Sequence, residues 1–451
     1  MNSLQDRIAA AIILVATFVI FRVSPVHTIY DSRYEMLFTQ QLLRHHSFSL
    51  GPETFSELRS HKPGQQHRRG IDFPYQLVQV GDSFYNFYPP GNTILGLPYV
   101  ALANAVGLSA TDQTGTYNPN GDDKMQKGLA ALLMAGLSVI IFFTARLVLS
   151  LGWSWLITIA SAFGTQIWST ASRAVWSQTW GIFVLGLAIW LIFRTEIKKV
   201  PLRPIFLATC LSWLYFIRPT FSISIAAIGL YVLVYHRKIL APFILTGCIW
   251  LAAFIGFSEY HFGQLLPPYY HSYDTRSLDK FWERFAGTVI SPSRGLLVYV
   301  SAIWFLIYLL ARYWKTSRVH LVILSTAVVV VHVIMVACYL GWHGGASYGP
   351  RLTTDIVPWL VLLGILAVDA RLRWHDKNKA HDSPIRLRTE WSFAVVLLAC
   401  SITLNGIGAI WQDTQRWNAK PENVNEAPSR LWDWKHPQFL GVPRNGAKVP
   451  P

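Results

Sequence analysis

The chain has 451 residues, of which 52% are hydrophobic and only 14% are charged, and its formal net charge is +15. Soluble domains carry about 25% charged residues, so this composition excludes an ordinary soluble domain and predicts an all-α polytopic membrane protein. We assign the positive charge to short loops that fix topology and meet anionic lipid, so nucleic acid is not an expected partner.

A series of apolar runs approaches or exceeds the ~17–25 residues that a spanning helix needs. The first run has no small-residue cleavage site after it, so we expect a retained helix and not a removed signal peptide. Pro219 ends one short run and starts the next, which predicts a tight hairpin at Arg218. The runs are 7–23, 91–108, 127–150, 153–171, 176–194, 202–217, 219–235, 239–257, 295–313, 319–340, 353–370 and 391–411.

Basic residues gather in the loops at 194–203, 237–238, 312–318 and 371–388. The positive-inside rule places these loops in the cytoplasm. Counting crossings from them predicts about eleven spanning helices and a cytoplasmic N-terminus. By the same count, run 91–108 lies on or dips into the membrane without crossing it. A multi-pass protein of the plasma (inner) membrane is expected.

The predicted topology makes residues 1–411 one transmembrane domain and puts two long segments, 24–126 and 258–294, on the extracytoplasmic face. The tail, 412–451, is rich in Trp, Pro and Asn, and we expect it to pack against the outer surface. The cysteines lie inside apolar runs, which predicts buried thiols and no disulfide framework. They are Cys210, Cys248, Cys338 and Cys400.

Directly after the first run, the chain becomes polar. Asp31 stands where the chain leaves the membrane, and Glu35 follows four residues later, so the two acids share one face of a helix. The apolar residues at 34–42 recur at helical spacing, which predicts an amphipathic helix on the membrane surface. We expect its acid groups to point into a cavity that the rest of the chain builds.

Other polar clusters fall on the same predicted face, at 86–91, 271–295 and 341–351. The last is rich in glycine and is flanked by His343 and Arg351. Arginine offers planar, paired donors that suit phosphate, so this loop is a candidate clamp for a lipid phosphate. A tight turn with an arginine anchored to lipid headgroups is an equally good interpretation.

Several motifs follow one another in a specific order. Together they resemble the GT-C superfamily of integral-membrane glycosyltransferases, in particular the polyprenyl-phosphate-sugar-dependent branch with protein O-mannosyltransferases and the lipid A aminoarabinose transferase. The motifs are an acid after the first helix, Tyr-Pro-Pro-Gly at 88–91, Gly-Thr-Gln-Ile-Trp at 164–168, Arg-Pro at 218–219, Ser-Pro-Ser-Arg-Gly at 291–295 and Gly-Gly-Ala-Ser-Tyr-Gly-Pro-Arg at 344–351.

The resemblance implies a catalytic carboxylate on the surface helix, which by position is Asp31, and a non-spanning helix at 91–108. Many relatives carry two adjacent acids, whereas Ser32 follows Asp31 here. Glu35 could supply the second acid, or a second acid is dispensable. The expected reaction moves a sugar from a polyprenyl phosphate to a hydroxyl or amine of a glycan, lipid or protein, with inversion and Asp31 as general base.

Arg351 and Arg294, with His343, are expected to stabilise the leaving phosphate. Each further candidate has a structural alternative: a salt bridge for Asp31, a packing role for Glu35, a headgroup anchor for Arg218, and aromatic belts for the rings. The substrate-contact candidates are Arg33, Glu35, Tyr88, Trp342 and Arg218.

Two other functional classes fit the composition. A transporter or flippase of a lipid-linked glycan would need paired ionisable residues deep in the helices, and the sequence holds few. A non-catalytic lipid-binding subunit would share the fold but would tolerate loss of Asp31. No metal and no other cofactor is expected, because the carboxylates form no obvious ligand cluster.

Overall fold

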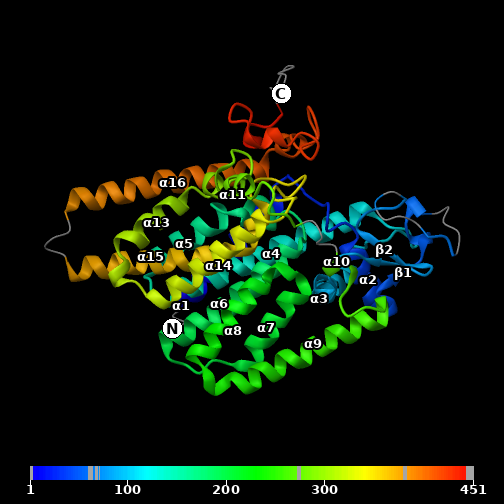
Figure 1. Cartoon of the computed structure of the whole chain (residues 1–451), viewed down its shortest axis with the longest axis horizontal. Helices are drawn as coiled ribbons and strands as arrows, with labels where there is room; N and C mark the ends of the chain where they lie inside the picture. Colours follow the sequence, from blue (N-terminus) through cyan, green and yellow to red (C-terminus); the bar gives the residue numbers. More distant parts are fainter. Residues whose placement is uncertain are drawn as a thin grey trace.

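The computed structural model describes residues 4–58, 64–66, 70, 72–271, 276–378 and 383–442. It is mostly helical, and seven of the helices in this part of the chain are long and apolar enough to cross a membrane (Figure 1). This supports a multi-pass membrane protein. The long helices are α1 (Leu4–Val23), α4 (Pro119–Ala145), α6 (Ser177–Lys198), α9 (Leu240–Phe262), α14 (Val319–Ala337), α15 (Val357–Lys377) and α16 (Pro384–Ile410), and the shorter apolar ones are α5 (Leu151–Phe163), α7 (Pro204–Ile217), α8 (Ser222–Tyr235) and α13 (Ala302–Arg312).

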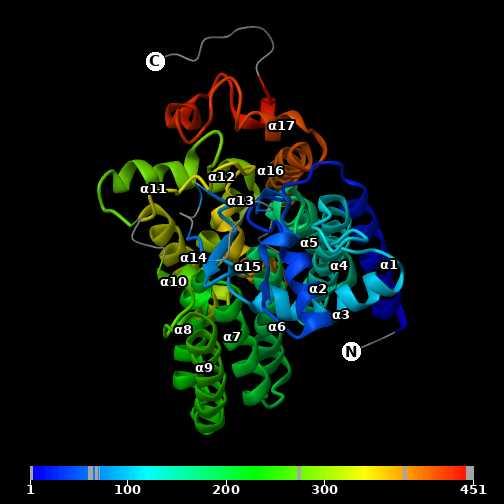
Figure 2. The ribbon, with the colours of Figure 1, turned by 90° about the vertical axis from the view of Figure 1, so that its right-hand side faces the viewer.

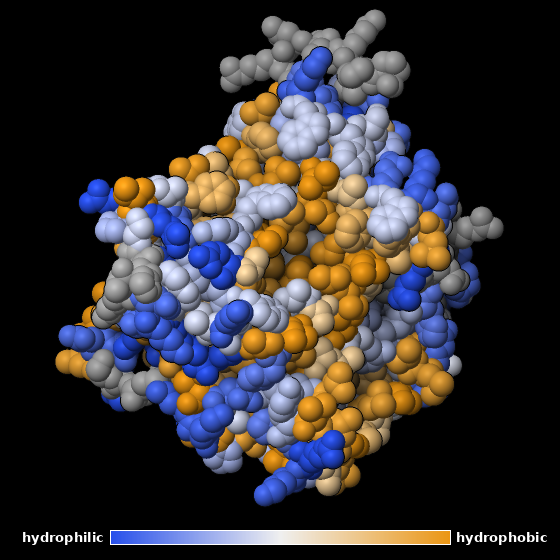
Figure 3. Space-filling view, turned by 60° about the vertical axis from the view of Figure 1, so that its left-hand side comes forward, coloured by the Kyte–Doolittle hydropathy of each residue, from blue (hydrophilic) through white to orange (hydrophobic). Residues whose placement is uncertain are grey.

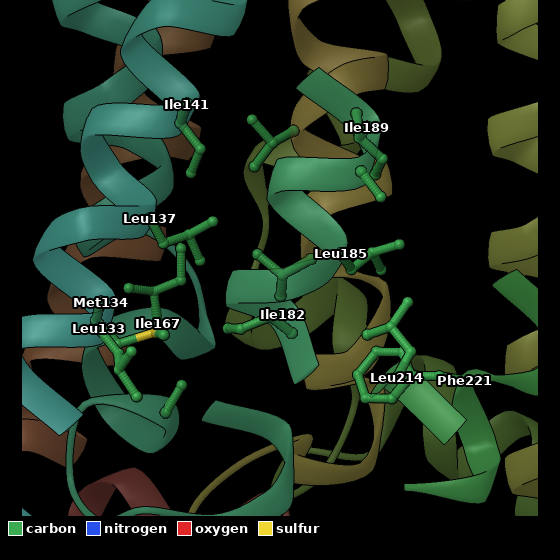
Figure 4. Close-up of a cluster of buried hydrophobic side chains, with 14 of the residues drawn as sticks. Leu133, Met134, Leu137, Ile141, Ile167, Ile182, Leu185, Ile189, Leu214 and Phe221 are labelled. Carbon is green, nitrogen blue, oxygen red and sulfur yellow. The ribbon is translucent and has the colours of Figure 1, made fainter. Parts of the chain in front are cut away.

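The largest hydrophobic core includes the seam between α4 and α6, as Figure 4 shows. Leu137 and Ile141 of α4 point toward α6, Leu185 and Ile189 of α6 belong to the same core, and all four side chains are buried. Gly186 permits this approach, because a Cβ there would lie 2.5 Å from Leu137. A glycine inside a helix costs about 1 kcal/mol of helix propensity, which close packing offsets here.

The long helices differ widely in the share of their residues that is buried inside the protein. In its most apolar stretch, 89% of α15 is buried inside the protein, but only 6% of α9. Large apolar side chains of α9, such as Ile244, Leu245 and Ile249, are exposed. The face in Figure 3 likewise carries a broad apolar area. Continuous exposed apolar surface on long helices is typical of proteins that face lipid.

The segment between α1 and α4 departs from the all-α expectation. It contains α2 (Glu35–His45) and α3 (Gly91–Ala105), which lie side by side (Figure 2), and also three short strands. The strands are β1 (Ser49–Leu50), β2 (Leu77–Val80) and β3 (Ser83–Asn86), in the antiparallel order β1-β3-β2. The all-α prediction is therefore wrong for this segment, because a two-residue turn at Gly81 folds residues 77–86 into a hairpin.

The second long connection holds α10 (Pro268–His271), α11 (Phe281–Ile290) and α12 (Leu296–Tyr299). The tail begins with α17 (Asp413–Arg416) and then forms short 3-10 turns, and it is drawn in red at the top of Figure 1. Trp417 and Leu431 of the tail pack on Trp342 in a cluster of their own.

All four cysteines are free thiols. Only Cys210 is buried; Cys338 is half-buried, and Cys248 and Cys400 are exposed. The expectation of four buried thiols is corrected, because Cys248 and Cys400 lie on faces of α9 and α16 that the rest of the chain leaves uncovered.

Candidate functional site

The chain between α1 and α2 is held from one side by the connection between α5 and α6. Arg173 is buried there and donates to the carbonyls of Phe21 (2.5 Å) and Ser24 (3.0 Å), which closes the C-terminal end of α1. Trp176 donates from Nε1 to Thr28 Oγ1 at 3.2 Å. A buried cation on helix-terminal carbonyls satisfies groups that the helix itself leaves open.

A sharp turn then separates Asp31 from α2. Tyr34 has a φ of 73°, a left-handed conformation that is uncommon for a side chain other than Gly or Asn. Its ring is fully buried against Phe55 and Tyr117, at centroid distances of 5.2 and 4.6 Å. This packing holds the turn in place, so Asp31 lies at a fixed corner before the helix and not on its face.

Asp31 forms an ion pair with Arg351 through Oδ2 and accepts a hydrogen bond from the Tyr75 hydroxyl at 3.0 Å. Its side chain stays 27% exposed. Burial alone would raise the pKa of Asp31, but the Arg351 charge and the hydrogen bonds outweigh it and hold the pKa below its ordinary value. The carboxylate is therefore ionised at neutral pH and is open to a ligand.

Arg351 follows the glycine-rich loop and starts a 3-10 turn, Arg351–Ile356, that leads into α15. Its guanidinium carbon lies 3.7 Å from the ring centroid of Trp176, a cation–π contact. Nη1 donates to Gly344 O at a long 3.4 Å, and Nε has no hydrogen-bond partner although the side chain is only 9% exposed. Arg351 therefore keeps donor capacity for an anion beside Asp31.

Arg218 lies in a second ion pair next to the first. It is buried at the turn between α7 and α8, where its Nε lies 3.2 Å from Asp355 Oδ2 and its Nη1 donates to Ser177 Oγ at 2.9 Å. Thr220 also donates to Asp355, at 2.6 Å. The headgroup-anchor interpretation of Arg218 is wrong, because the side chain points into the protein. Its charge also lowers the pKa of Asp31, behind the larger effects of burial and Arg351.

Glu35 does not join Asp31, although the spacing predicted a shared face. It is fully buried and accepts hydrogen bonds from Thr93 Oγ1 (2.7 Å) and Asn86 Nδ2 (3.0 Å). Burial raises its pKa to about 7. The shared-face prediction fails because Asp31 precedes the turn at Tyr34 and only Glu35 is helical. This geometry favours the packing role for Glu35.

Arg33 pairs with Glu57 at 2.6 Å and lies 4.8 Å from the Tyr34 ring, so it meets the strand-bearing segment and not Arg351. Tyr88 lies closer to the acid. Burial raises its pKa well above the ordinary value, and the charge of Asp31 adds to this rise. Its ring packs on Tyr269 at 5.3 Å. Tyr88 thus remains a candidate wall of the site.

Arg294, His343 and Trp342 serve the fold of the glycine-rich loop. His343 Nδ1 accepts from Gly345 N–H at 3.2 Å, and burial, with the charge of Arg294, lowers its pKa to about 4, so it is neutral. Trp342 is buried and lies against Gly287, where a Cβ would come within 2.3 Å. Arg294 is fully buried and donates to His343 O, Ser293 O, Gly345 O, Asn418 Oδ1 and Gln438 Oε1.

This geometry favours a structural role for Arg294 and His343 over the expected phosphate contacts, because the chain occupies the donors of Arg294 and His343 carries no charge. Trp342 is buried in the cluster with the tail, and this packing favours a structural role over the expected substrate contact. Arg351 alone of these three expected phosphate ligands meets Asp31.

Sequence reasoning missed Tyr75, Arg173 and Trp176, which hold the site together. A signal existed for Arg173, since a lone arginine between two apolar runs is costly at that depth and marks a partner. Tyr75 carried no such signal.

Among the described residues, no three His, Cys, Asp or Glu side chains come together in a way that could hold a metal ion. No protein-family profile matches the chain, and no curated protein matches it either. The likeness to GT-C enzymes therefore stays an expectation drawn from the motifs.

Proposed function

We propose that the protein is a GT-C-type glycosyltransferase that moves a sugar from a polyprenyl phosphate to a hydroxyl or amine acceptor on the outer face of the membrane, with inversion. The observation that carries the proposal is the open pair of Asp31 and Arg351. An ionised, partly exposed carboxylate stands beside an arginine with spare donors. A general base and a phosphate ligand are the two groups that this reaction needs.

In the proposed reaction, the acceptor oxygen or nitrogen attacks the anomeric carbon and Asp31 takes its proton. The bond between that carbon and the phosphate oxygen breaks, and the electron pair leaves with the polyprenyl phosphate. Arg351, held on the Trp176 ring, stabilises the charge on the leaving group. Arg218 and Asp355 support the site from behind and have no role in proton transfer. No metal or cofactor is proposed.

The proposed topology has eleven crossings, made by the seven long and the four shorter apolar helices. The N-terminus is in the cytoplasm, and α3 is a surface helix. Contacts between distant loops support this topology: Asp31, Trp176, Arg218 and Arg351 come from segments that charge counting assigns to one outer face, and they meet in one cluster. Polyprenyl-phosphate sugars, membrane lipids and a glycan, lipid or protein acceptor are the proposed partners.

The test compares the wild type with Asp31→Asn in proteoliposomes, using a panel of polyprenyl-phosphate sugars and measuring sugar release. Loss of the base is expected to lower turnover by about 10²–10⁴-fold, while donor binding persists because Arg351 is intact. Glu57→Gln is the matched control, since Glu57 also pairs with an arginine in the same segment. It should release sugar like the wild type.

Equal turnover in wild type and Asp31→Asn would remove Asp31 as the base. If no donor is consumed while labelled glycolipid crosses the bilayer, the transporter alternative replaces the enzyme.

A further inference from the structure

Asp31 and Arg351 come from opposite ends of the chain, so something must fix the distance between them. We propose that Asp122 and Gln126, one turn apart on α4, are the positioning residues that set the placement of the Asp31 carboxylate relative to the Arg351 guanidinium. The activity readout for this inference rests on the proposed function.

Asp122 caps α2 from another helix. The first residues of α2 have no capping side chain of their own, so their N–H groups need an outside acceptor. Asp122 Oδ1 accepts from Met36 N–H at 3.2 Å, and Oδ2 accepts from Tyr34 N–H at 3.4 Å and from the Tyr117 hydroxyl at 2.8 Å. The carboxylate is fully buried. It therefore fixes both ends of the left-handed turn that follows Asp31.

Gln126 connects this turn to the support of Arg351. Its Nε2 donates to Ser32 O at 2.8 Å, directly after Asp31, and also to Asp122 Oδ2 at 3.1 Å. Its Oε1 accepts from Val175 N–H at 3.3 Å. Val175 precedes Trp176, the ring on which Arg351 lies. The fully buried amide of Gln126 thus links the backbone next to Asp31 to the backbone next to Trp176.

The chemistry of this link needs an amide. A single side chain must donate to Ser32 and accept from Val175, and glutamine does both, whereas a glutamate carboxylate can only accept. Gln126→Glu keeps the shape but loses the bond to Ser32 and puts a second negative charge beside Asp122. Since a misplacement of about 1 Å can cost about 10²-fold in rate, the substitution should act on turnover through Asp31.

The experiment measures kcat and donor KM for Gln126→Glu in the proteoliposome assay. We expect kcat to fall by about 10²-fold, with a much smaller change in donor KM because Arg351 is unaltered. Gln40→Glu is the matched control: Gln40 is a buried amide of α2 that bonds to residues 109–111, away from Arg351. It should keep kcat.

A second readout needs no activity. Asp31→Asn should lower the thermal unfolding temperature in the wild-type and Gln40→Glu backgrounds, because it breaks the ion pair, and much less in Gln126→Glu, where the pair is already displaced. An equal loss in all backgrounds, or full turnover by Gln126→Glu while Asp31→Asn is inactive, overturns the positioning role and leaves the proposed function intact. If wild type and Asp31→Asn turn over donor equally, Asp31 is not the base, and the unfolding cycle alone decides this inference.

Discussion

Two clusters of the same chemistry stand at the two ends of α15. At the far end, Arg371 pairs with Glu390 at 2.8 Å, and Glu390 also accepts from the hydroxyls of Tyr308 (2.7 Å) and Tyr313 (2.5 Å). At the near end, Arg351 pairs with Asp31, which accepts from the Tyr75 hydroxyl. Each cluster joins an arginine, a carboxylate and tyrosine, so composition alone does not distinguish them.

Exposure separates the two clusters. The side chains of Arg371 and Glu390 are 1% and 5% exposed, whereas Asp31 is 27% exposed and Arg351 Nε has no partner. In the buried pair of Arg371 and Glu390, which we call closed, the protein itself supplies the hydrogen-bond partners, so the pair stabilises the fold. In the pair of Asp31 and Arg351, which we call open, hydrogen-bonding groups remain that a ligand can use. Unmet polar capacity at a buried position is costly and is therefore a better sign of function than the ion pair itself.

The largest expected effect comes from breaking the closed cluster. Arg371→Met leaves the charge of Glu390 buried without its partner, which should cost about 3–5 kcal/mol of stability. Thermal unfolding in detergent or bilayer measures the loss. The folded fraction should keep wild-type turnover per molecule, so a loss of turnover without a loss of stability would contradict the structural assignment.

Breaking the open cluster should lower turnover more than it lowers stability. Arg351→Met removes the proposed phosphate ligand and should lower sugar turnover by about 10²–10³-fold. Stability should change less than in Arg371→Met, because Asp31 can be hydrated where it is exposed. Donor turnover and unfolding temperature, measured on both variants, give the comparison directly. If one of the two variants lost more than the other in both turnover and unfolding temperature, the clusters would not differ in role.

A third prediction uses the pH dependence of Glu35. Its pKa is about 7 in the folded protein, above the ordinary 4.5, so the folded state binds the proton more tightly than the unfolded state. This stabilisation is full below about pH 4.5 and is lost as the pH rises through 7, by at most about 3 kcal/mol. Unfolding temperatures from pH 5 to 8 should fall for the wild type more than for Glu35→Gln. Parallel curves would show that Glu35 does not titrate in this range.

The smallest effect is expected at Arg33. Its pair with Glu57 is partly exposed, and such pairs contribute about 0–1 kcal/mol. Arg33→Ala should leave donor KM and turnover near wild type, because the guanidinium is directed toward Glu57 and away from Arg351. A clear rise in KM would restore the substrate contact that the sequence predicted for Arg33.

The sequence predicts the membrane character, the apolar helices and the polar segment that starts at Asp31, because these depend on local composition and periodicity. It also singles out Asp31 and Arg351, each by its own surroundings. It does not predict that they pair, since they lie 320 residues apart and no spacing rule links them. The hairpin of β2 and β3 does have a local signal in the sequence, the two-residue turn at Gly81.

The roles of the two arginines beside the glycine-rich loop could not be read from the chain. Arg294 and Arg351 follow similar glycine- and serine-rich stretches and look equivalent in sequence. Part of the difference comes from the tail, where Gln438 and Asn418 each accept a hydrogen bond from Arg294. Tertiary contacts of this kind produce no periodic pattern in the sequence, so the sequence does not predict them.

The exposed apolar surface of α9 has a consequence for how the surrounding bilayer acts on the protein. With 6% of its apolar stretch buried, α9 leaves most of that stretch exposed to its surroundings, and in a bilayer those surroundings are acyl chains. Its C-terminal end touches the strand-bearing segment, where Phe257 meets Phe48 at 4.9 Å and His261 meets Tyr85 at 5.6 Å. A tilt of α9 would therefore act directly on the segment that carries Asp31, whereas the enclosed α15 lacks such exposure.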